Sequence, residues 1–327
     1  MLKKSQGLIL ALLMFFSSYG QEKQEEDSPE ENKLEEVIVT GTKTIRKLSS
    51  LPLPALIITQ KEIESSNSTR LSEILNEQSG LITIPDFGGG EGIQLQGLDS
   101  QYTLILIDGL PIIGRFGGTL DINRFSTGNI KQIEIVKGAS SSLYGSEAIG
   151  GVINIITKEP LKGFQGDLSY YTGSNNTNDA NVLLNYKNNN IGFNLFANSY
   201  KSDGYDLNNS DEFNTVEPFK NYTINSKTIF DLNKKLSIAI NGRYFDQVQD
   251  YVASSELIGK SSIRDWNISL TGNLKSNEKW NNSIELYKTN YYAEEYLNTS
   301  DGENYSSTFY DHNLIHIELK SIYKTEL

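Results

Sequence analysis

The chain has 327 residues, no cysteine and a net charge of −12. This length allows two or more domains, and the lack of cysteine excludes disulfides and thiolate metal sites. The negative charge, with no basic stripe along the sequence, argues against nucleic acid as a partner.

Residues 1–20 have the layout of a secretory signal peptide. Two lysines precede an apolar run from Leu8 to Phe16, and Ser18 and Gly20 are small residues of the kind that precedes a cleavage site. The run is apolar all round, unlike an amphipathic helix, and it is too short to span a bilayer as a stable helix. We therefore expect export with cleavage after these residues.

Residues 21–36 include eight acidic residues and two lysines and have almost no apolar side chains, so they are expected to form a flexible leader. Residues 37–43 follow and begin with the β-prone run Val37-Ile38-Val39-Thr40. An extended segment on a flexible tether can add a strand to the sheet edge of a partner protein. Pairing inside its own domain is the alternative.

Residues 48–159 alternate short apolar strands with short helices. Residues 55–58 are expected to form a strand, Thr59 and Glu62 stand at capping-box spacing for one helix, and Ser68 is the expected cap of a second helix. Further strands are expected at 81–84, 93–96, 103–107, 133–136 and 151–157. This mixture predicts a compact α/β domain.

Aspartates in this region are interpreted as turn residues. Asp108-Gly109 predicts a tight turn after the strand at 103–107. Asp99 and Asp108 are therefore not expected to act as an acid/base pair. Gly88 to Gly92 is expected to be a loop, because no Gly-Lys-Ser/Thr follows that would make it a phosphate site.

From Phe164 the helical signals disappear, and residues 164–327 predict about eight antiparallel strands of roughly ten residues. Apolar and polar residues alternate: Trp266, Ile268, Leu270 and Leu274 share one face, and Asp265, Asn267, Ser269, Thr271 and Asn273 share the other. A face for lipid and a face for water indicate a transmembrane β-barrel. A soluble sandwich is the alternative, and it would need a second sheet over the apolar face.

Tyrosines near the expected strand ends are predicted to lie at the membrane interfaces. They are Tyr170, Tyr171, Tyr222, Tyr244, Tyr291 and Tyr292.

Three blocks of sequence resemble the plug domain of TonB-dependent receptors in their order and spacing. They are Leu95-Gln96-Gly97-Leu98-Asp99 with 104–111, the stretch 130–145 (IKQIEIVKGASSSLYG), and 148–158 (AIGGVINIITK). The resemblance is sharp over about 37–158. It implies an α/β plug domain followed by an antiparallel transmembrane β-barrel, which this sequence carries only in part.

The resemblance also implies function and partners. The run Glu36, Val37, Ile38, Val39 and Thr40 looks like a TonB box, which TonB pulls with energy from the proton gradient of the inner membrane. Such receptors lie in the outer membrane of Gram-negative cells, surrounded by its lipid, and take up a scarce nutrient. A ferric siderophore is the expected ligand, with haem or cobalamin as the alternatives.

Apical plug loops of this family help to hold the ligand, which implies ligand-binding roles for Phe87, Glu91, Arg115 and Phe116. Ordinary surface-loop composition is an equally good account of these four residues. Many members have an arginine where this chain has Gln96. An ionic contact from plug to barrel at that point is therefore in doubt, although an amide could still hydrogen-bond to a wall carboxylate.

No catalytic or metal site is expected, and the resemblance implies no cofactor. His312 and His316 would share one face of a strand but lie about 13 Å apart, too far for a common metal. No Ser/His/Asp constellation occurs in a nucleophile setting, so an enzyme is not expected.

Geometry raises a separate expectation about the barrel. A barrel of ~8 strands is filled by its own side chains, whereas plugged transporters need ~22. We therefore expect the sequence to be an N-terminal fragment, a truncated product or half of a split receptor. The alternative of a different class is an exported soluble β-rich binding protein.

Overall fold

The computed structural model describes residues 37–38, 46–47, 54–85, 90–115, 118–138, 144–208, 210, 213–277 and 279–323. The chain divides into two compact units, Met1–Glu35 and Glu36–Leu327. All described residues belong to the second unit, so the fold is that of Glu36–Leu327. The expected signal peptide and acidic leader lie outside the described residues.

A five-stranded mixed sheet forms the centre of the first part of this unit, with strand order β3-β8-β9-β6-β7. Its strands are β3 (Ala55–Thr59), β6 (Thr103–Ile107), β7 (Leu110–Pro111), β8 (Ile130–Lys137) and β9 (Gly151–Thr157). β6 and β9 pair in parallel, and the other neighbours are antiparallel. The runs of Ile, Leu and Val that predicted strands here are buried on both sides, as is usual for strands inside a mixed sheet.

Two short helices follow β3. In α2 (Gln60–Ser66) the Thr59 and Glu62 capping box is present as predicted. The second helix, α3 (Leu71–Asn76), begins later than predicted, because Arg70 and not Ser68 is its N-cap. The Glu73 carboxylate accepts the backbone N–H groups of Thr69 and Arg70, which satisfies donors that Ser68 was expected to bind.

Two hairpins belong to this domain. β4 (Leu81–Pro85) and β5 (Glu91–Leu95) form a separate hairpin. The predicted turn at Asp108-Gly109 joins β6 to β7, with φ of 50° and 87° at its two residues. Positive φ at both central positions suits a right-handed twisted hairpin, and Asp and Gly tolerate it best.

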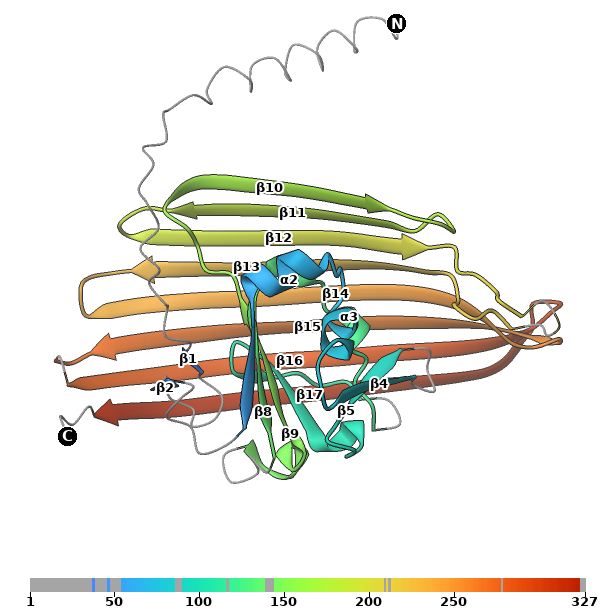
Figure 1. Ribbon diagram of the computed structural model, residues 1–327, viewed down its shortest axis with the longest axis horizontal. Helices are drawn as coiled ribbons and strands as arrows, with labels where there is room; N and C mark the ends of the chain where they lie inside the picture. The colour runs from blue at the N-terminus through green and yellow to red at the C-terminus, as the bar shows by residue number, and fades with distance from the viewer. Residues whose placement is uncertain are drawn as a thin grey trace, which may run out of the picture. The chain divides into compact units, whose positions relative to one another are not determined.

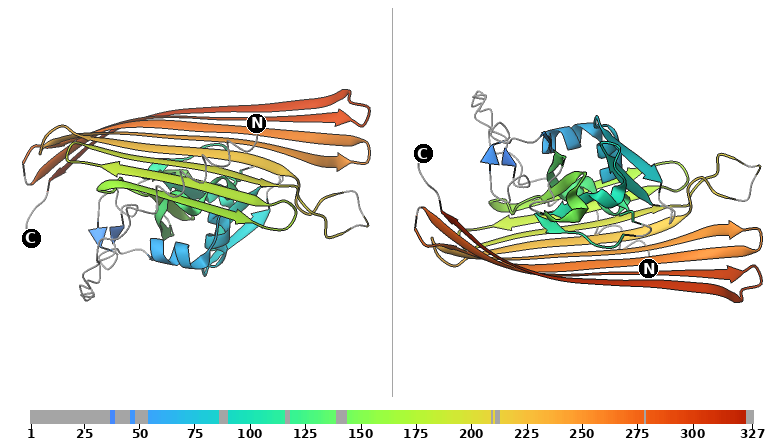
Figure 2. Two further views of the ribbon diagram at one scale, coloured as in Figure 1. Left: turned by 90° about the horizontal axis from the view of Figure 1, so that it is seen from above. Right: turned by 90° about the horizontal axis from the view of Figure 1, so that it is seen from below.

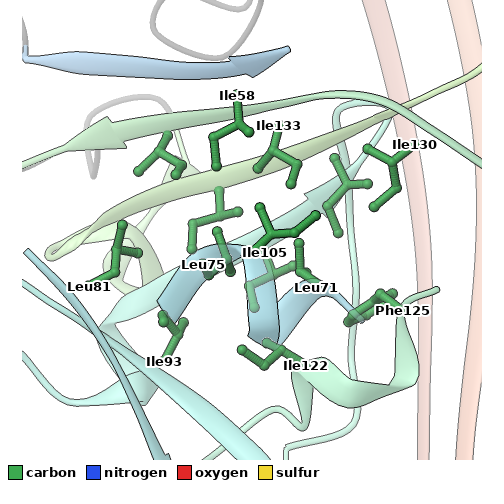
Figure 3. Close-up of a cluster of buried hydrophobic side chains, with 14 of the residues drawn as sticks. Ile58, Leu71, Leu75, Leu81, Ile93, Ile105, Ile122, Phe125, Ile130 and Ile133 are labelled. Carbon is green, nitrogen blue, oxygen red and sulfur yellow. The ribbon is translucent and has the colours of Figure 1, made fainter. Parts of the chain in front are cut away.

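One hydrophobic core unites these elements (Figure 3). Leu71 and Leu75 of α3 lie between the hairpin residues Leu81 and Ile93 and the sheet residue Ile105, and all five are at most 4% exposed. Leu71, Ile74 and Leu75 share one helix face, and this spacing turns all three toward the core.

The second part is an eight-stranded antiparallel sheet in sequence order, β10 to β17 (Figure 1). Among the described residues, no ladder joins β10 to β17, so these two strands are its edges. The strands are β10 (Gly163–Thr172), β11 (Asn178–Lys187), β12 (Ile191–Ser202), β13 (Phe219–Asp231), β14 (Leu236–Ser254), β15 (Leu257–Lys275), β16 (Trp280–Thr299) and β17 (Asn304–Tyr323). The fold class is therefore as predicted.

Strand length differs from the prediction over half of this sheet. β10 and β11 have 10 residues, as expected, but β14 to β17 have 19 or 20. The additional residues mix apolar and polar types on both faces, as at Leu257, Ile258 and Ile263 of β15, so alternation of apolar and polar residues did not reveal them. The short turns at 188–190, 232–235 and 276–279 lie at one end of the sheet, and the connection 203–218 lies at the other.

The helices and the five-stranded sheet lie against one face of the eight-stranded sheet (Figure 2). In the described part of the chain, no helix has the length and apolar character needed to cross a membrane.

Candidate functional site

The two faces of the eight-stranded sheet have opposite chemistry. In β15, Asp265 and Ser269 are 0% and 2% exposed, whereas Ile268 and Leu270 are 49% and 42% exposed. The polar side chains are thus buried under the α/β domain, and the apolar ones face outward. This inversion of the usual soluble pattern was the main sequence prediction for this region.

The strand register aligns the outward apolar residues into rows across the sheet. One row runs through all eight strands: Phe164, Tyr186, Phe193, Thr228, Ile240, Leu270, Leu286 and Ile317. Six residues further along β10, a row of mixed character begins, which we call the tyrosine row: Tyr170, Ala180, Ser199, Tyr222, Asp246, Arg264, Tyr292 and Asp311. Apolar residues thus form a band that ends where tyrosines and charges appear.

A place at a membrane interface requires an outward ring, and this orientation is observed for Tyr170, Tyr222, Tyr244 and Tyr292. Tyr291 faces inward, so the prediction is wrong for this residue. Tyr291 is 4% exposed and faces the α/β domain, where the Arg124 guanidinium carbon lies 5.1 Å from its ring centroid. Tyr171 also falls on the inward parity, opposite the buried Asp179. Adjacent tyrosines in a strand point to opposite faces, so only one of each predicted pair can face outward.

A buried charge cluster joins the α/β domain to the sheet at its centre. Both Arg124 and Arg243 donate from Nη1 to Oδ2 of Asp265, at 3.3 Å and 2.5 Å. Arg124 comes from the short helix 122–124 of the α/β domain, whereas Arg243 and Asp265 belong to the neighbouring strands β14 and β15. All three residues are at most 6% exposed. A carboxylate shared by two guanidiniums is strongly held where water is absent.

Backbone carbonyls complete the bonding of this cluster. Arg124 donates to the carbonyl oxygens of Asp121 and Ile113, and Arg243 donates to that of Arg124. Arg243 also lies over the ring of Phe125, 5.0 Å from its centroid. Arg243 of the sheet is therefore bonded to the backbone of the α/β domain as well as to Asp265 on the next strand.

A second ion pair lies near the start of α3. Arg70 donates to Oδ2 of Asp179 at 2.8 Å, and its guanidinium carbon lies 3.9 Å from the ring centroid of Tyr200. The other oxygen of Asp179 accepts the amides of Asn181 and Asn198. Burial lowers the pKa of Arg70 and the charge of Asp179 opposes that shift, but a guanidinium stays protonated at any working pH.

A third set of ion pairs lies where the chain passes from the α/β domain to the eight-stranded sheet. Lys227 of β13 pairs with Asp108 and with Glu159, at 3.0 Å in each case. Asp108 also accepts the backbone N–H and the hydroxyl of Thr157. The turn, the end of β9 and the connection to β10 are thereby held to the wall at one point.

Close backbone approaches accompany these polar contacts. A Cβ on Gly128 would lie 2.7 Å from the ring of Phe196, and one on Gly114 would lie 2.2 Å from the ring of Tyr291. Tyr287 donates its hydroxyl to the carbonyl of Pro111 at 2.9 Å. The two parts therefore fit closely, with glycine at the tightest positions.

The predicted ligand-binding residues are only partly described. Phe87 and Phe116 lie outside the described residues. Glu91 begins β5, and its backbone N–H donates to Asp121. Arg115 donates to the carbonyl oxygens of Ser100, Thr103 and Gly118, so its guanidinium is already committed inside the domain. A ligand would have to share this arginine with three carbonyls.

Between the upper loops and the wall is a cavity of about 40 Å³. Its lining includes Asp121 and Arg124 from the α/β domain and Gln247, Tyr291 and Glu295 from the sheet. Burial raises the pKa of Asp121, which the Glu91 N–H, Arg124 and the Asn123 N–H partly offset. This volume suits one or two waters, because small-molecule pockets measure about 300–1,000 Å³.

The remaining predictions concern Gln96, the two histidines and metal binding. Gln96 is exposed in a turn with φ of 55°, and the ties to the wall are made elsewhere, at Arg70, Arg124 and Asp108. His312 and His316 lie on the inward face of the edge strand β17, opposite Tyr291 and Tyr287. No group of His, Cys, Asp and Glu within the described residues has the arrangement of a metal site.

The predicted TonB-binding segment is described only at Val37 and Ile38. These two residues form β1 (Val37–Ile38) and pair antiparallel with β2 (Arg46–Lys47). Glu36, Val39 and Thr40 lie outside the described residues. The segment is thus extended at the two described positions, in a ladder of only two residue pairs.

Alternation along the strands placed Asp265 on the polar face but gave it no role. It gave none to Arg70, Arg124, Lys227 or Arg243 either. The available signal was a charged residue at an inward position of an otherwise uncharged strand face. Such a residue must find a partner when buried. The partners lie between 22 and 141 residues away in the sequence, so the residue itself does not identify them.

Comparison with known proteins points in one direction. Residues 47–152 match the family described as TonB-dependent Receptor Plug Domain. A relative described as vitamin B12 transporter BtuB of Vibrio cholerae serotype O1 is 39% identical over 126 residues, which is 38% of this chain and 21% of the relative. The protein of the same description from Vibrio vulnificus is 26% identical over 247 residues, covering 73% of this chain and 39% of the relative.

Solved structures show a similar fold. A ferric enterobactin receptor of Pseudomonas aeruginosa superposes with a TM-score of 0.64 at 18% identity, over 81% of this chain and 46% of that one. The siderophore receptor PirA of Acinetobacter baumannii gives 0.67 at 18% identity, over 80% and 44%. At this identity the likeness concerns the fold alone. The chain spans less than half the length of each of these four relatives.

Proposed function

Because the chain belongs to the TonB-dependent receptors, with their plug domain and part of their β-barrel, we propose that it serves in active uptake of a scarce nutrient across the outer membrane. In this proposal the α/β domain is the plug and the eight-stranded sheet is barrel wall. The observation that carries it is the two-faced sheet, apolar outward and polar toward the plug. No catalysis is assigned to the chain.

The outward apolar band supports a place in lipid. Transmembrane strands need about 9–11 residues, and an outward apolar band flanked by aromatic residues is typical of outer-membrane proteins. Each strand from β10 to β17 provides that length. Export by the proposed signal peptide at residues 1–20 would deliver the chain to this membrane.

The polar inner face supports a plug that can be rearranged. Small polar contacts and a few buried charge clusters hold the plug, so its parts can open locally at lower cost than the continuous hydrogen-bond ladders of the wall. We propose that TonB pairs with the segment Glu36, Val37, Ile38, Val39 and Thr40. The two-residue ladder between β1 and β2 is short enough for a partner strand to replace it.

A ferric siderophore remains the proposed ligand, with Phe87, Glu91, Arg115 and Phe116 as proposed contacts. Cobalamin is the second candidate, because the relatives with similar plug sequences are described as vitamin B12 transporters. The close plug match supports cobalamin only weakly, since ligands of such receptors are held by wall and loops as well as by the plug.

Growth tests separate these ligands. A strain lacking the gene is supplied with one ferric siderophore, haem or cobalamin as its limiting source of iron or cobalamin. The siderophore proposal expects growth to fail on that siderophore alone and to return when the gene is restored. Growth that depends on the gene only with cobalamin would replace siderophore by cobalamin. Normal growth of the deletion strain on every source would contradict uptake itself.

A further inference from the structure

Two lysines stand directly opposite each other on the outward face of the sheet. Lys201 of β12 and Lys220 of β13 are register partners. The next residues along each strand, Ser202 and Asn221, are 7% and 4% exposed and face the plug. Alternation along the strands therefore turns both lysines outward.

The lysine pair lies just beyond the apolar band. Tyr222 of the tyrosine row is two residues from Lys220, and Ile224, two residues further, is 48% exposed in the band. The Lys220 ammonium lies 5.1 Å from the ring centroid of Tyr222. Tyrosine rings of this kind mark the level of lipid headgroups in membrane proteins.

Within the described residues, this arrangement leaves two positive charges without an ion-pair partner. Like charges directly opposite each other destabilise a strand pair. In the described part of the chain neither lysine takes part in an ion pair. Asp246, which lies opposite Tyr222, pairs with Arg264 instead.

On the adjacent strands β14 and β15, opposite charges cancel each other near the level of the two lysines. Asp246 and Arg264 are register partners there and form an ion pair of 3.4 Å. On β10 to β13, the outward positions at the level of the lysines are uncharged except for the lysines themselves. From β10 to β15, excess positive charge near this level is thus confined to the β12–β13 pair.

We propose that Lys201 and Lys220 together bind the phosphate of a lipid headgroup in the membrane leaflet at this end of the sheet. The inference rests on the proposed outer-membrane location of the sheet. Two ammonium groups on paired strands can share one phosphate, which removes their mutual repulsion. Lysines at the headgroup level contribute to binding of anionic lipids, and their alkyl stems can lie along the apolar band.

Titration of the full chain in a non-ionic detergent tests the site. The probe is lipid A, a phosphorylated glycolipid, and binding is measured by native mass spectrometry. The double variant Lys201→Gln/Lys220→Gln is expected to bind about 30-fold more weakly, since each lysine near an anionic surface contributes about a fivefold factor. Lys201→Arg/Lys220→Arg should retain binding, because it keeps both charges.

Two controls make the result specific. Lys234→Gln/Lys235→Gln removes two exposed lysines from a turn at the opposite end of the sheet and should leave binding unchanged. Inorganic phosphate at the same concentration should not displace the lipid. Equal binding by wild type and the Lys201/Lys220 glutamine variant, equal loss in the turn variant, or full displacement by inorganic phosphate would each overturn the proposal.

The outcomes also separate this site from the proposed function. A wild-type chain that stays soluble and monomeric without detergent would overturn both, because the sheet would not face lipid. A chain that needs detergent but binds lipid A without help from the two lysines would overturn the lysine site alone.

Discussion

Asp265 is the residue on which the contact between plug and wall depends most. Its Oδ2 atom accepts hydrogen bonds from both Arg124 and Arg243, and the residue is fully buried. Removing it would leave two buried guanidiniums facing each other without their shared counter-charge. Removing one partner of a buried ion pair costs more stability than replacing the whole pair with apolar residues, because an uncompensated buried charge remains.

Asp265→Ala should therefore lower the free energy of unfolding by about 3–5 kcal/mol. The matched control is Asp246→Ala, which removes the Arg264 partner on the same two strands but on the exposed face. That exposed pair should contribute no more than about 1 kcal/mol. Thermal and denaturant unfolding in detergent would measure both, and equal losses would show that burial of the charge cluster has no special weight.

Gly128 tests the closeness of plug and wall without charge. Gly128→Ala would place a Cβ 2.7 Å from the ring of Phe196, so it should cost about 1–3 kcal/mol from overpacking. Gly166→Ala is the control, because its Cβ would meet Leu184 at 3.5 Å, an ordinary contact.

A double variant isolates the cause of this loss. If the clash is with the ring, Phe196→Leu combined with Gly128→Ala should lose less stability than the sum of the two single changes, as measured by a double-mutant cycle. Strict additivity would place the strain somewhere other than the Phe196 ring.

At the scale of elements, β1 is the shortest piece of structure with a proposed partner. Ile38→Pro removes a backbone N–H and prevents regular strand pairing. We expect the variant to lose co-purification with TonB and nutrient-limited growth, with unchanged thermal stability. Glu31→Pro in the acidic leader is the control and should behave as wild type. Normal growth of the Ile38→Pro strain would rule out strand addition at this segment.

Many elements of the plug could be predicted from the sequence because their signals are local. Runs of Ile, Leu and Val gave the strands, capping-box spacing gave α2, and Asp108-Gly109 gave a turn. The start of α3 was missed because Ser68 is as good a cap by type as any neighbour. In the structure Glu73 binds the free N–H groups from inside the helix instead.

The charge clusters could be predicted only in part, because alternation fixes the face of a residue and not its partner. Asp265 was placed on the polar face, but the contacts of Arg124 with Arg243 and Asp265 join segments 119 and 141 residues apart. Tyr291 was missed for a related reason. Tyr291 and Tyr292 are adjacent in the sequence, so only parity distinguishes the plug-facing ring from the outward one.

At the scale of the whole molecule, the outward apolar band can be tested by one charge. Leu270→Arg lies in the middle of the band, and an arginine at mid-bilayer on the lipid face should cost about 2–4 kcal/mol. Ser262→Arg lies beyond the tyrosine row on the same strand, where the cost near an interface is about 0–1 kcal/mol. Urea unfolding in phosphatidylcholine vesicles would measure the difference. Equal, small effects would mean that the band does not face lipid.

The way Asp265 is shared also bears on how the plug could leave and return. Arg243 and Asp265 are on adjacent strands, so the wall keeps a neutral couple after Arg124 withdraws. Arg124 in turn carries two carbonyl acceptors of its own domain with it. Neither side is left with a stranded carboxylate, so in the proposed opening cycle Asp265 keeps a partner whether the plug is in place or withdrawn.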